Sequence, residues 1–286
     1  MNKSVKCKNE EIKNCDCANL VKEFINDELN GEISDLASYD FSKLEGDLKL
    51  GNQCGYFDCD DTLLARAIYC VLWKEIDCVS KLIKDGKYRG DTLNSFNTVF
   101  GKNGDKAKKI SDEITNPPER YMFREKVKDF SKHYHTIGNF VILPNKLIKD
   151  IMLIVKEEGQ YVKKLESTTI NRYRGLQSSG LHDYFDQFLG VLENWYNKSD
   201  EISDDWKKVL DGNKELFPKK FDEFRDMFFL NSYFDDGRKN VRRLTEKFPS
   251  AKGRPTLEKA EKYLKDATQI INQRAEIMIE NLEKNL

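Results

Sequence analysis

The chain has 286 residues, which is enough to bury a core as one large domain or as two modest ones. Its hydrophobic content of 39% and charged content of 34% are typical of a soluble globular protein. The formal net charge of −1 excludes a global field that would steer the protein to nucleic acid or to a membrane. Binding of that kind would require a local patch.

The start of the chain indicates no targeting segment. Residues 1–13 are charged throughout and lack the apolar stretch of a signal peptide, and no apolar run reaches the length that spans a bilayer. The seven cysteines are an odd number, which without a secretory signal favours reduced thiols. We therefore expect a cytoplasmic protein without a membrane partner.

Apolar residues at helical spacing predict a mainly α-helical, bundle-like single domain. We expect a loose tail over residues 1–17, a main helical domain over 18–248, a linker over 249–255 and a C-terminal amphipathic helix over 256–286. Thr62 or Asp61 is the expected N-cap of a helix over residues 62–85, and Gly86 is its expected stop. Within the main domain, helices are expected over residues 20–29, 62–85, 118–132, 146–158, 181–196 and 219–234.

The C-terminal helix carries one apolar stripe, with Arg274 in its seam. The stripe comprises Leu257, Ala260, Leu264, Ala267, Ile271, Met278 and Leu282. A stripe of this kind usually packs on the body of its own chain, and its near-heptad spacing also suits pairing with another chain. Homo-oligomer formation through this helix is therefore a second expectation.

Residues 133–145 interrupt the helical pattern with a small β element. They hold two of the three histidines of the chain, and Gly138-Asn139 forms a turn before the apolar run Phe-Val-Ile-Leu. The sequence thus predicts a buried strand near residues 138–143. His135 is the candidate catalytic residue, because polar groups set against buried backbone are where chemistry tends to occur.

Two further segments place arginine beside glycine, one at residues 88–96 and one at residues 170–175. A guanidinium group next to glycine suits a planar anion such as phosphate or carboxylate. Internal ion pairs that clamp loops to helices would use the same residues, and this alternative stays open. The predicted ligand-binding residues around the Gly138-Asn139 turn are Arg89, Asp91, Asn94, Asn139, Asn171, Arg172, Arg174 and Asp183.

The order of these motifs resembles an uncharacterised family of bacterial proteins over roughly residues 88–236. The motifs are Tyr-Arg-Gly-Asp-Thr-Leu-Asn-Ser-Phe, Thr-Ile-Gly-Asn-Phe-Val-Ile-Leu-Pro, Ile-Asn-Arg-Tyr-Arg-Gly and Leu-His-Asp-Tyr-Phe-Asp-Gln-Phe-Leu. The resemblance implies a shared fold and a shared polar site, and it implies no reaction.

Residues 135–145 also resemble the second half of HNH-type nuclease domains, in which a Gly-Asn turn and strand precede a metal-binding helix. That family needs an upstream Asp-His-Ile-x-Pro segment whose histidine activates water. The nearest segment here, residues 112–117, has no histidine. The resemblance therefore supports the predicted turn and strand, and it does not support an active nuclease.

The run Asp58-Cys59-Asp60-Asp61 looks like the nucleophile loop of haloacid-dehalogenase-type phosphatases. That chemistry requires a buried parallel strand before the loop, and residues 51–56 make a poor strand. An acidic helix N-terminus, which the helix dipole favours, is the interpretation we adopt.

The N-terminal cysteines depart from the spacing of structural zinc sites. Cys15-x-Cys17 is too close for a C-x₂₋₄-C knuckle, although Cys54 and Cys59 would complete four thiols. The sequence therefore predicts no metal site and assigns no cofactor. Cys70 and Cys78 are expected to be buried small hydrophobic residues.

Residues 237–254 are strongly basic and could contact the phosphates of nucleic acid, while a solvated basic face is the alternative. The candidate residues of this patch are Arg238, Lys239, Arg242 and Arg243.

From these features we expect an intracellular bacterial protein that binds a phosphate-bearing ligand, a nucleotide or nucleic acid, as an effector in defence or in a mobile element. The alternatives are a non-catalytic helical interaction module and a divergent metal-dependent nuclease, and the sequence leaves open whether the chain is an enzyme.

Overall fold

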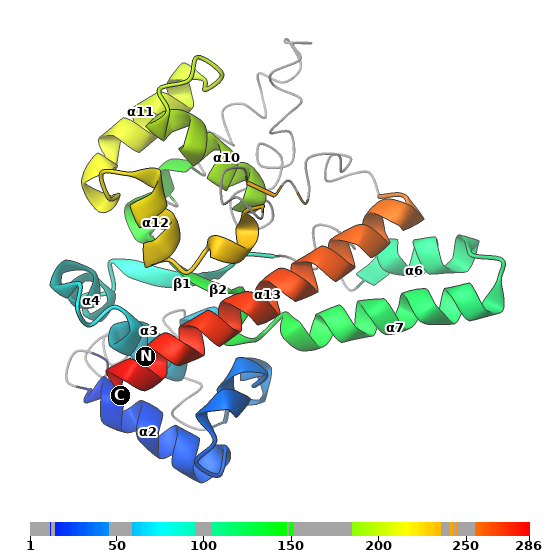
Figure 1. The fold of residues 1–286 in the computed structure, drawn as a ribbon, viewed down its shortest axis with the longest axis horizontal. Coiled ribbons are helices and arrows are strands. Elements are labelled where there is room, and N and C mark those ends of the chain that lie inside the picture. Colours follow the sequence, from blue (N-terminus) through cyan, green and yellow to red (C-terminus); the bar gives the residue numbers. More distant parts are fainter. Residues whose placement is uncertain are drawn as a thin grey trace, which may run out of the picture. The chain divides into compact units, whose positions relative to one another are not determined.

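The computed structural model describes residues 12, 15–45, 59–94, 104–147, 149–151, 185–235, 241–242, 244 and 255–286. Most of these residues are helical, and the described strands form one two-stranded sheet (Figure 1). This confirms the predicted mainly α-helical fold with a small β element. No helix within these ranges is long and apolar enough to cross a membrane.

The chain forms two compact units, each assembled from separate segments. Unit 1 contains residues 1–92, 135–145 and 271–286, and unit 2 contains residues 93–134 and 146–270. The division falls inside the long C-terminal helix α13 (Leu257–Asn285), so this helix contributes its first half to unit 2 and its second half to unit 1.

Unit 1 begins with helix α2 (Cys17–Glu28), whose first turn is capped by the Asp16 carboxylate. The short 3-10 segments η1 (Ile33–Ala37), η2 (Phe41–Lys43) and η4 (Cys59–Asp61) follow, and η4 leads into helix α3 (Leu63–Leu72). The Thr62 hydroxyl accepts a hydrogen bond from the Ala65 N–H at 3.2 Å, so of the two predicted candidates, Thr62 and Asp61, Thr62 is the N-cap.

The helix predicted over residues 62–85 is two helices, which corrects the prediction. Helix α3 ends at Leu72, and helix α4 (Asp77–Lys84) starts after a turn. Nearly all of α3 is buried, whereas α4 is amphipathic, with Val79 and Ile83 buried. Apolar residues continue through the turn between the two helices, so their spacing did not reveal the break. Gly86, with φ +69°, ends α4 as predicted.

The sheet pairs strand β1 (Tyr88–Thr92) antiparallel with strand β2 (Phe140–Pro144). In this register Tyr88 lies opposite Pro144 and Thr92 opposite Phe140. All five positions of β2 are buried, which confirms the predicted strand. Residues 137–139 form the 3-10 segment η6 (Ile137–Asn139), so the strand starts two residues after Gly138. Strand β1 was missed, because arginine, glycine and aspartate are poor strand formers.

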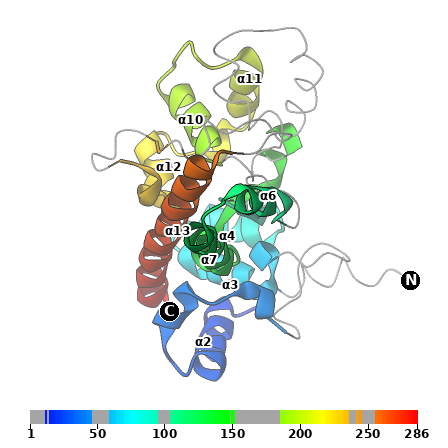
Figure 2. The same ribbon diagram turned by 90° about the vertical axis from the view of Figure 1, so that its right-hand side faces the viewer.

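Unit 2 contains helices α6 (Asp105–Glu113), α7 (Pro117–His133), α10 (Phe185–Tyr196), α11 (Asp204–Gly212) and α12 (Phe221–Met227), together with η9 (Lys214–Leu216) and η10 (Asn231–Tyr233). Helix α7 runs beside the first half of α13, where Phe130 packs edge-on against Tyr263 (Figure 2). Helices α10, α11 and α12 lie together in both views (Figures 1 and 2).

The helix predicted over residues 146–158 is described only at its start. Residues 145–147 and 149–151 are helical, and the remainder of the predicted helix lies outside the described residues.

Helix α13 packs against the core, as its stripe predicts. Apart from the partly exposed Leu257, every residue of the predicted stripe is buried. Arg274 is 0% exposed, and its guanidinium group donates hydrogen bonds to the backbone carbonyl oxygens of Gly138, at 2.9 Å, and of Phe140. Homo-oligomer formation through this helix stays a prediction.

We expect Arg274→Met to lower the free energy of unfolding by roughly 2–5 kcal/mol, because two buried carbonyl oxygens would lose their donor while the side-chain volume is kept. Urea denaturation followed by circular dichroism measures the change. Gln273→Met is the matched control, since Gln273 is the exposed preceding residue of the same helix and a change there is expected to stay within about 0.5 kcal/mol. Equal denaturation midpoints for both variants would contradict this role of Arg274.

Candidate functional site

The predicted polar residues of the β element lie in unit 1, except Asn94, which lies in unit 2. Asp91 is buried on β1, where its carboxylate accepts the Thr92 N–H at 2.9 Å. Asn139 is fully buried in η6, directly before β2. His135 is half-buried, and its backbone carbonyl accepts the Phe41 N–H at 2.9 Å. The pairing of β1 with β2 thus brings Asp91 and Asn139 to the same end of the sheet.

The glycines of these motifs are sites of close backbone packing. A Cβ atom on Gly90 would lie 1.6 Å from the Asp60 carbonyl oxygen, and one on Gly138 would lie 2.2 Å from the Ile271 carbonyl oxygen. Real Cβ atoms do not approach so closely, so glycine is required at both positions. The space beside Gly90 is therefore filled by the backbone of η4.

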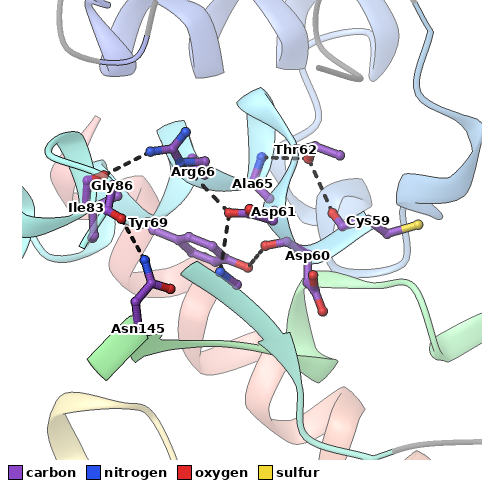
Figure 3. Close-up of polar contacts among 11 residues, drawn as sticks. Cys59, Asp60, Asp61, Thr62, Ala65, Arg66, Tyr69, Ile83, Gly86 and Asn145 are labelled. Atoms are coloured by element: carbon purple, nitrogen blue, oxygen red, sulfur yellow. Dashed lines mark hydrogen bonds and ion pairs between the residues drawn. The ribbon is translucent and has the colours of Figure 1, made fainter. Parts of the chain in front are cut away.

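A buried charged cluster lies under this contact (Figure 3), and it joins two residues of the acidic run at 58–61 to Arg66, which the sequence analysis did not single out. Asp60, Asp61 and Arg66 are 4%, 3% and 2% exposed. The Asp61 carboxylate lies 4.0 Å from Arg66 Nε and 3.5 Å from the Gly90 nitrogen. Arg66 also donates to the Ile83 carbonyl at 3.0 Å, so one side chain ties α3 to α4.

The electrostatics of the cluster follow from its burial. Desolvation lowers the pKa of the Arg66 guanidinium, and the neighbouring Asp61 carboxylate opposes that shift. The Tyr69 hydroxyl donates to the Asp60 carbonyl at 2.8 Å. These contacts link η4, α3, α4 and β1. They agree with the interpretation of the acidic run at residues 58–61 as the N-terminus of a helix. We interpret the cluster as an internal clamp.

The remaining predicted site residues are distributed as follows. In unit 2, the Asn94 amide donates to the Tyr233 hydroxyl at 2.8 Å, and Arg242 donates to the Phe234 carbonyl at 3.0 Å. The other predicted residues lie outside the described residues, or, for Arg89, have a side chain outside them: Asn171, Arg172, Arg174, Asp183, Arg238, Lys239 and Arg243. Their predicted roles stay predictions.

Unit 2 contains a cleft of about 540 Å³ that the sequence analysis did not find. Its apolar wall is formed by Trp195 and Tyr196 at the end of α10 and by Phe217 after η9. We call it the lysine cleft, because four of its lining residues are lysines: Lys198, Lys207, Lys214 and Lys219. Its volume lies in the range of pockets that bind small molecules.

Hydrogen bonds hold the aromatic wall in place. The Trp195 indole donates to the Asp211 carboxylate at 3.0 Å, and the Tyr196 hydroxyl donates to the Pro218 carbonyl at 2.7 Å. Burial, followed by the nearby Glu223 carboxylate, raises the pKa of the Tyr196 phenol to about 12. The phenol is therefore a neutral donor at physiological pH. Both rings remain partly exposed to solvent.

The charge of the lysine cleft is positive. Asp211 is the acidic side chain among its described lining residues, and its carboxylate already accepts the indole N–H. Among the residues that the structure describes, none of the four ammonium groups forms an ion pair. Cationic groups above aromatic rings can hold an anionic ligand that carries a planar ring. This site could not be predicted from the sequence, since single lysines between helices are typical of solvated surface.

A model of a family of unknown function, DUF6994, matches residues 96–278. The chain belongs to this family, which confirms the expected membership of an uncharacterised family. The match begins after β1 and includes β2, the lysine cleft and most of α13. Searches of curated proteins and of solved structures found no match.

We expect Gly90→Ala to destabilise the protein by about 3 kcal/mol, because the added methyl group would force β1 away from the Asp60 backbone. Thermal denaturation with a van't Hoff analysis measures the change. Gly212→Ala is the control: apart from its chain neighbours and the backbone of its own helix, no described atom lies within 4 Å of the added methyl group, and alanine in a helix is expected to raise stability by up to about 1 kcal/mol. If Gly90→Ala were as stable as Gly212→Ala, the close approach at β1 would be refuted.

Proposed function

We propose that this member of the DUF6994 family binds a nucleotide, or another phosphate-bearing ligand with a planar ring, in the lysine cleft. One observation carries the proposal: four lysines and two partly exposed aromatic rings line a single cleft of about 540 Å³. Lysine ammonium groups would hold phosphate oxygens, and Trp195 would provide the apolar surface for a base. The ligand class is the one that the sequence analysis predicts. The site is different, because the sequence analysis predicts a pocket around Asn139 and the proposal uses the lysine cleft.

The sequence-predicted pocket around Asn139 is the alternative position for the same ligand class. Close backbone packing at Gly90 and Gly138 favours the lysine cleft over this pocket. The space beside each of these glycines is occupied by another backbone segment, so no ligand can approach the glycine there. Arg172→Ala addresses the alternative directly, since Arg172 belongs to the predicted pocket and not to the lysine cleft. A role in defence or in a mobile element stays a prediction.

The charge contribution is tested by isothermal titration calorimetry with ATP and with inorganic triphosphate. In the variant that combines Lys207→Gln with Lys214→Gln, we expect about tenfold weaker binding of both probes, because two partly screened ammonium–phosphate contacts are lost. Lys208→Gln is the matched control, since Lys208 is exposed on the same helix and outside the cleft lining. Unchanged affinity in the double variant, together with loss of binding in Arg172→Ala, would move the site to the pocket around Asn139.

The ring contribution is tested separately. We expect Trp195→Leu to weaken binding of ATP at least about fivefold and to leave binding of inorganic triphosphate unchanged, because only the nucleotide has a base to stack. Equal loss for both probes would show that Trp195 shapes the cleft without contacting a base. Circular dichroism spectra that match the wild type establish that the variant is folded.

A further inference from the structure

The lysine cleft contains a carboxylate that phosphate binding does not explain. Asp211 is the acidic side chain among the described lining residues, and it shares the cleft with four lysines. A carboxylate repels phosphate groups, so its presence weakens the attraction that the lysines provide. An uncharged acceptor could also hold the Trp195 indole N–H, since this contact is a single hydrogen bond. Asp211 is therefore a candidate for contact with a part of the ligand that lies away from the phosphates.

The Asp211 carboxylate has an oxygen that a ligand can use. Its Oδ1 accepts the Trp195 indole N–H at 3.0 Å, and its Oδ2 forms no hydrogen bond or ion pair within the part of the chain that the structure describes. Asp211 is exposed to solvent, so a ligand in the cleft can reach it. A carboxylate oxygen accepts more than one hydrogen bond, so Oδ1 also keeps capacity for a second donor.

Helix α11 presents Asp211 together with a lysine. Lys207 and Asp211 lie four positions apart, which places them on the same face of α11, and both line the cleft. Opposite charges at this spacing can pair, but these two form no ion pair in the described structure. Both groups are therefore available to a ligand, the ammonium group for an acceptor and the carboxylate for a donor.

The aromatic surface beside Asp211 is held by ring contacts. The Trp195 ring packs edge-on against Tyr196, with centroids 4.9 Å apart, and is tilted against Phe217 at 5.7 Å. Together with the indole hydrogen bond to Asp211, these contacts fix the orientation of the ring. A base stacked on Trp195 would lie beside the carboxylate, because the indole N–H points to it. The hydrogen-bonding edge of the base is then what Asp211 meets.

We propose that Asp211 selects guanine, so that the lysine cleft binds a guanine nucleotide; this inference rests on the proposed function of the cleft. Guanine has two adjacent donors on one edge, the N1–H and the 2-amino group, and a carboxylate can accept both. Adenine and cytosine each place a ring nitrogen that is an acceptor beside their amino group, and uracil has a single N–H between two carbonyl oxygens. Guanine also offers O6 and N7 as acceptors for a lysine.

Isothermal titration calorimetry of the full-length protein with GTP, ITP and ATP tests the proposal. ITP differs from GTP in lacking the 2-amino group, so it removes one of the two donors and keeps the ring system and the triphosphate. We expect ITP to bind at least about fivefold, and ATP about tenfold, more weakly than GTP. Equal affinity for all three would overturn the selection of guanine and leave the cleft as a nucleotide site. Absence of binding by all three would overturn the proposed function as well.

Asp211→Asn separates recognition of the base from support of the cleft wall. The asparagine carbonyl oxygen can still accept the Trp195 indole N–H, while the amide nitrogen donates where the carboxylate accepts. We expect this variant to bind GTP and ITP with equal affinity. A loss by the same factor for GTP, ITP and ATP would show that Asp211 only supports Trp195, and it would contradict the inference.

Asp205→Asn is the matched control, because Asp205 is exposed on the same helix, lies outside the cleft lining and loses the same charge. This variant is expected to keep the wild-type preference for GTP over ITP. If it lost that preference as fully as Asp211→Asn, the effect would be one of net charge and the inference would fail. The wild-type comparison of GTP with ITP decides the selectivity even if Asp211→Asn does not fold.

Discussion

The architecture of unit 1 depends on the contact between the turn at Gly138 and the second half of α13. Arg274 reaches this turn from a fully buried position and donates to the carbonyl oxygens on either side of Asn139. Because Gly138 has no side chain, the turn can approach the helix backbone closely enough for those hydrogen bonds. The turn fixes where β2 begins, and the register of β2 fixes β1. Strand β1 then passes over η4 at Gly90, which has the same requirement for glycine. The two motif glycines are thus successive parts of one packing arrangement.

Much of this fold could be predicted because its signals are local. The apolar run of β2, the cap at Thr62 and the stripe of α13 each lie within a few turns of the chain, where periodicity and capping act. Strand β1 could not be found in this way, because its sequence is poor in strand formers and its pairing with β2 spans many residues. The break after Leu72 was hidden because apolar residues continue through it. The two units, built from separate segments, have no signature in the linear sequence.

The candidate sites were harder to predict than the fold. Arginine beside glycine suggested an anion pocket, but at Gly90 the open side of the glycine faces the backbone of η4. Buried Arg66 and Asp61 form the kind of internal ion pair that the sequence analysis kept as an alternative. The lysine cleft is lined by residues from the end of α10, the segment that follows it, α11, η9 and the segment after η9. No spacing rule connects residues that meet only through helix packing, so the site could not be predicted from the sequence. The match to the DUF6994 family includes the whole cleft but assigns it no function.

We propose that the ligand site is the lysine cleft and that the Gly138 segment serves the architecture. The three tryptophans of the chain allow a direct test by NMR, because each indole N–H gives its own resonance. Trp195 lines the cleft, Trp206 is buried nearby in unit 2, and Trp73 is buried in unit 1. On titration with ATP, the Trp195 resonance is predicted to shift with saturation while the Trp73 resonance stays in place. An unchanged Trp195 resonance, with saturable shifts at His135 and Asn139, would contradict the account.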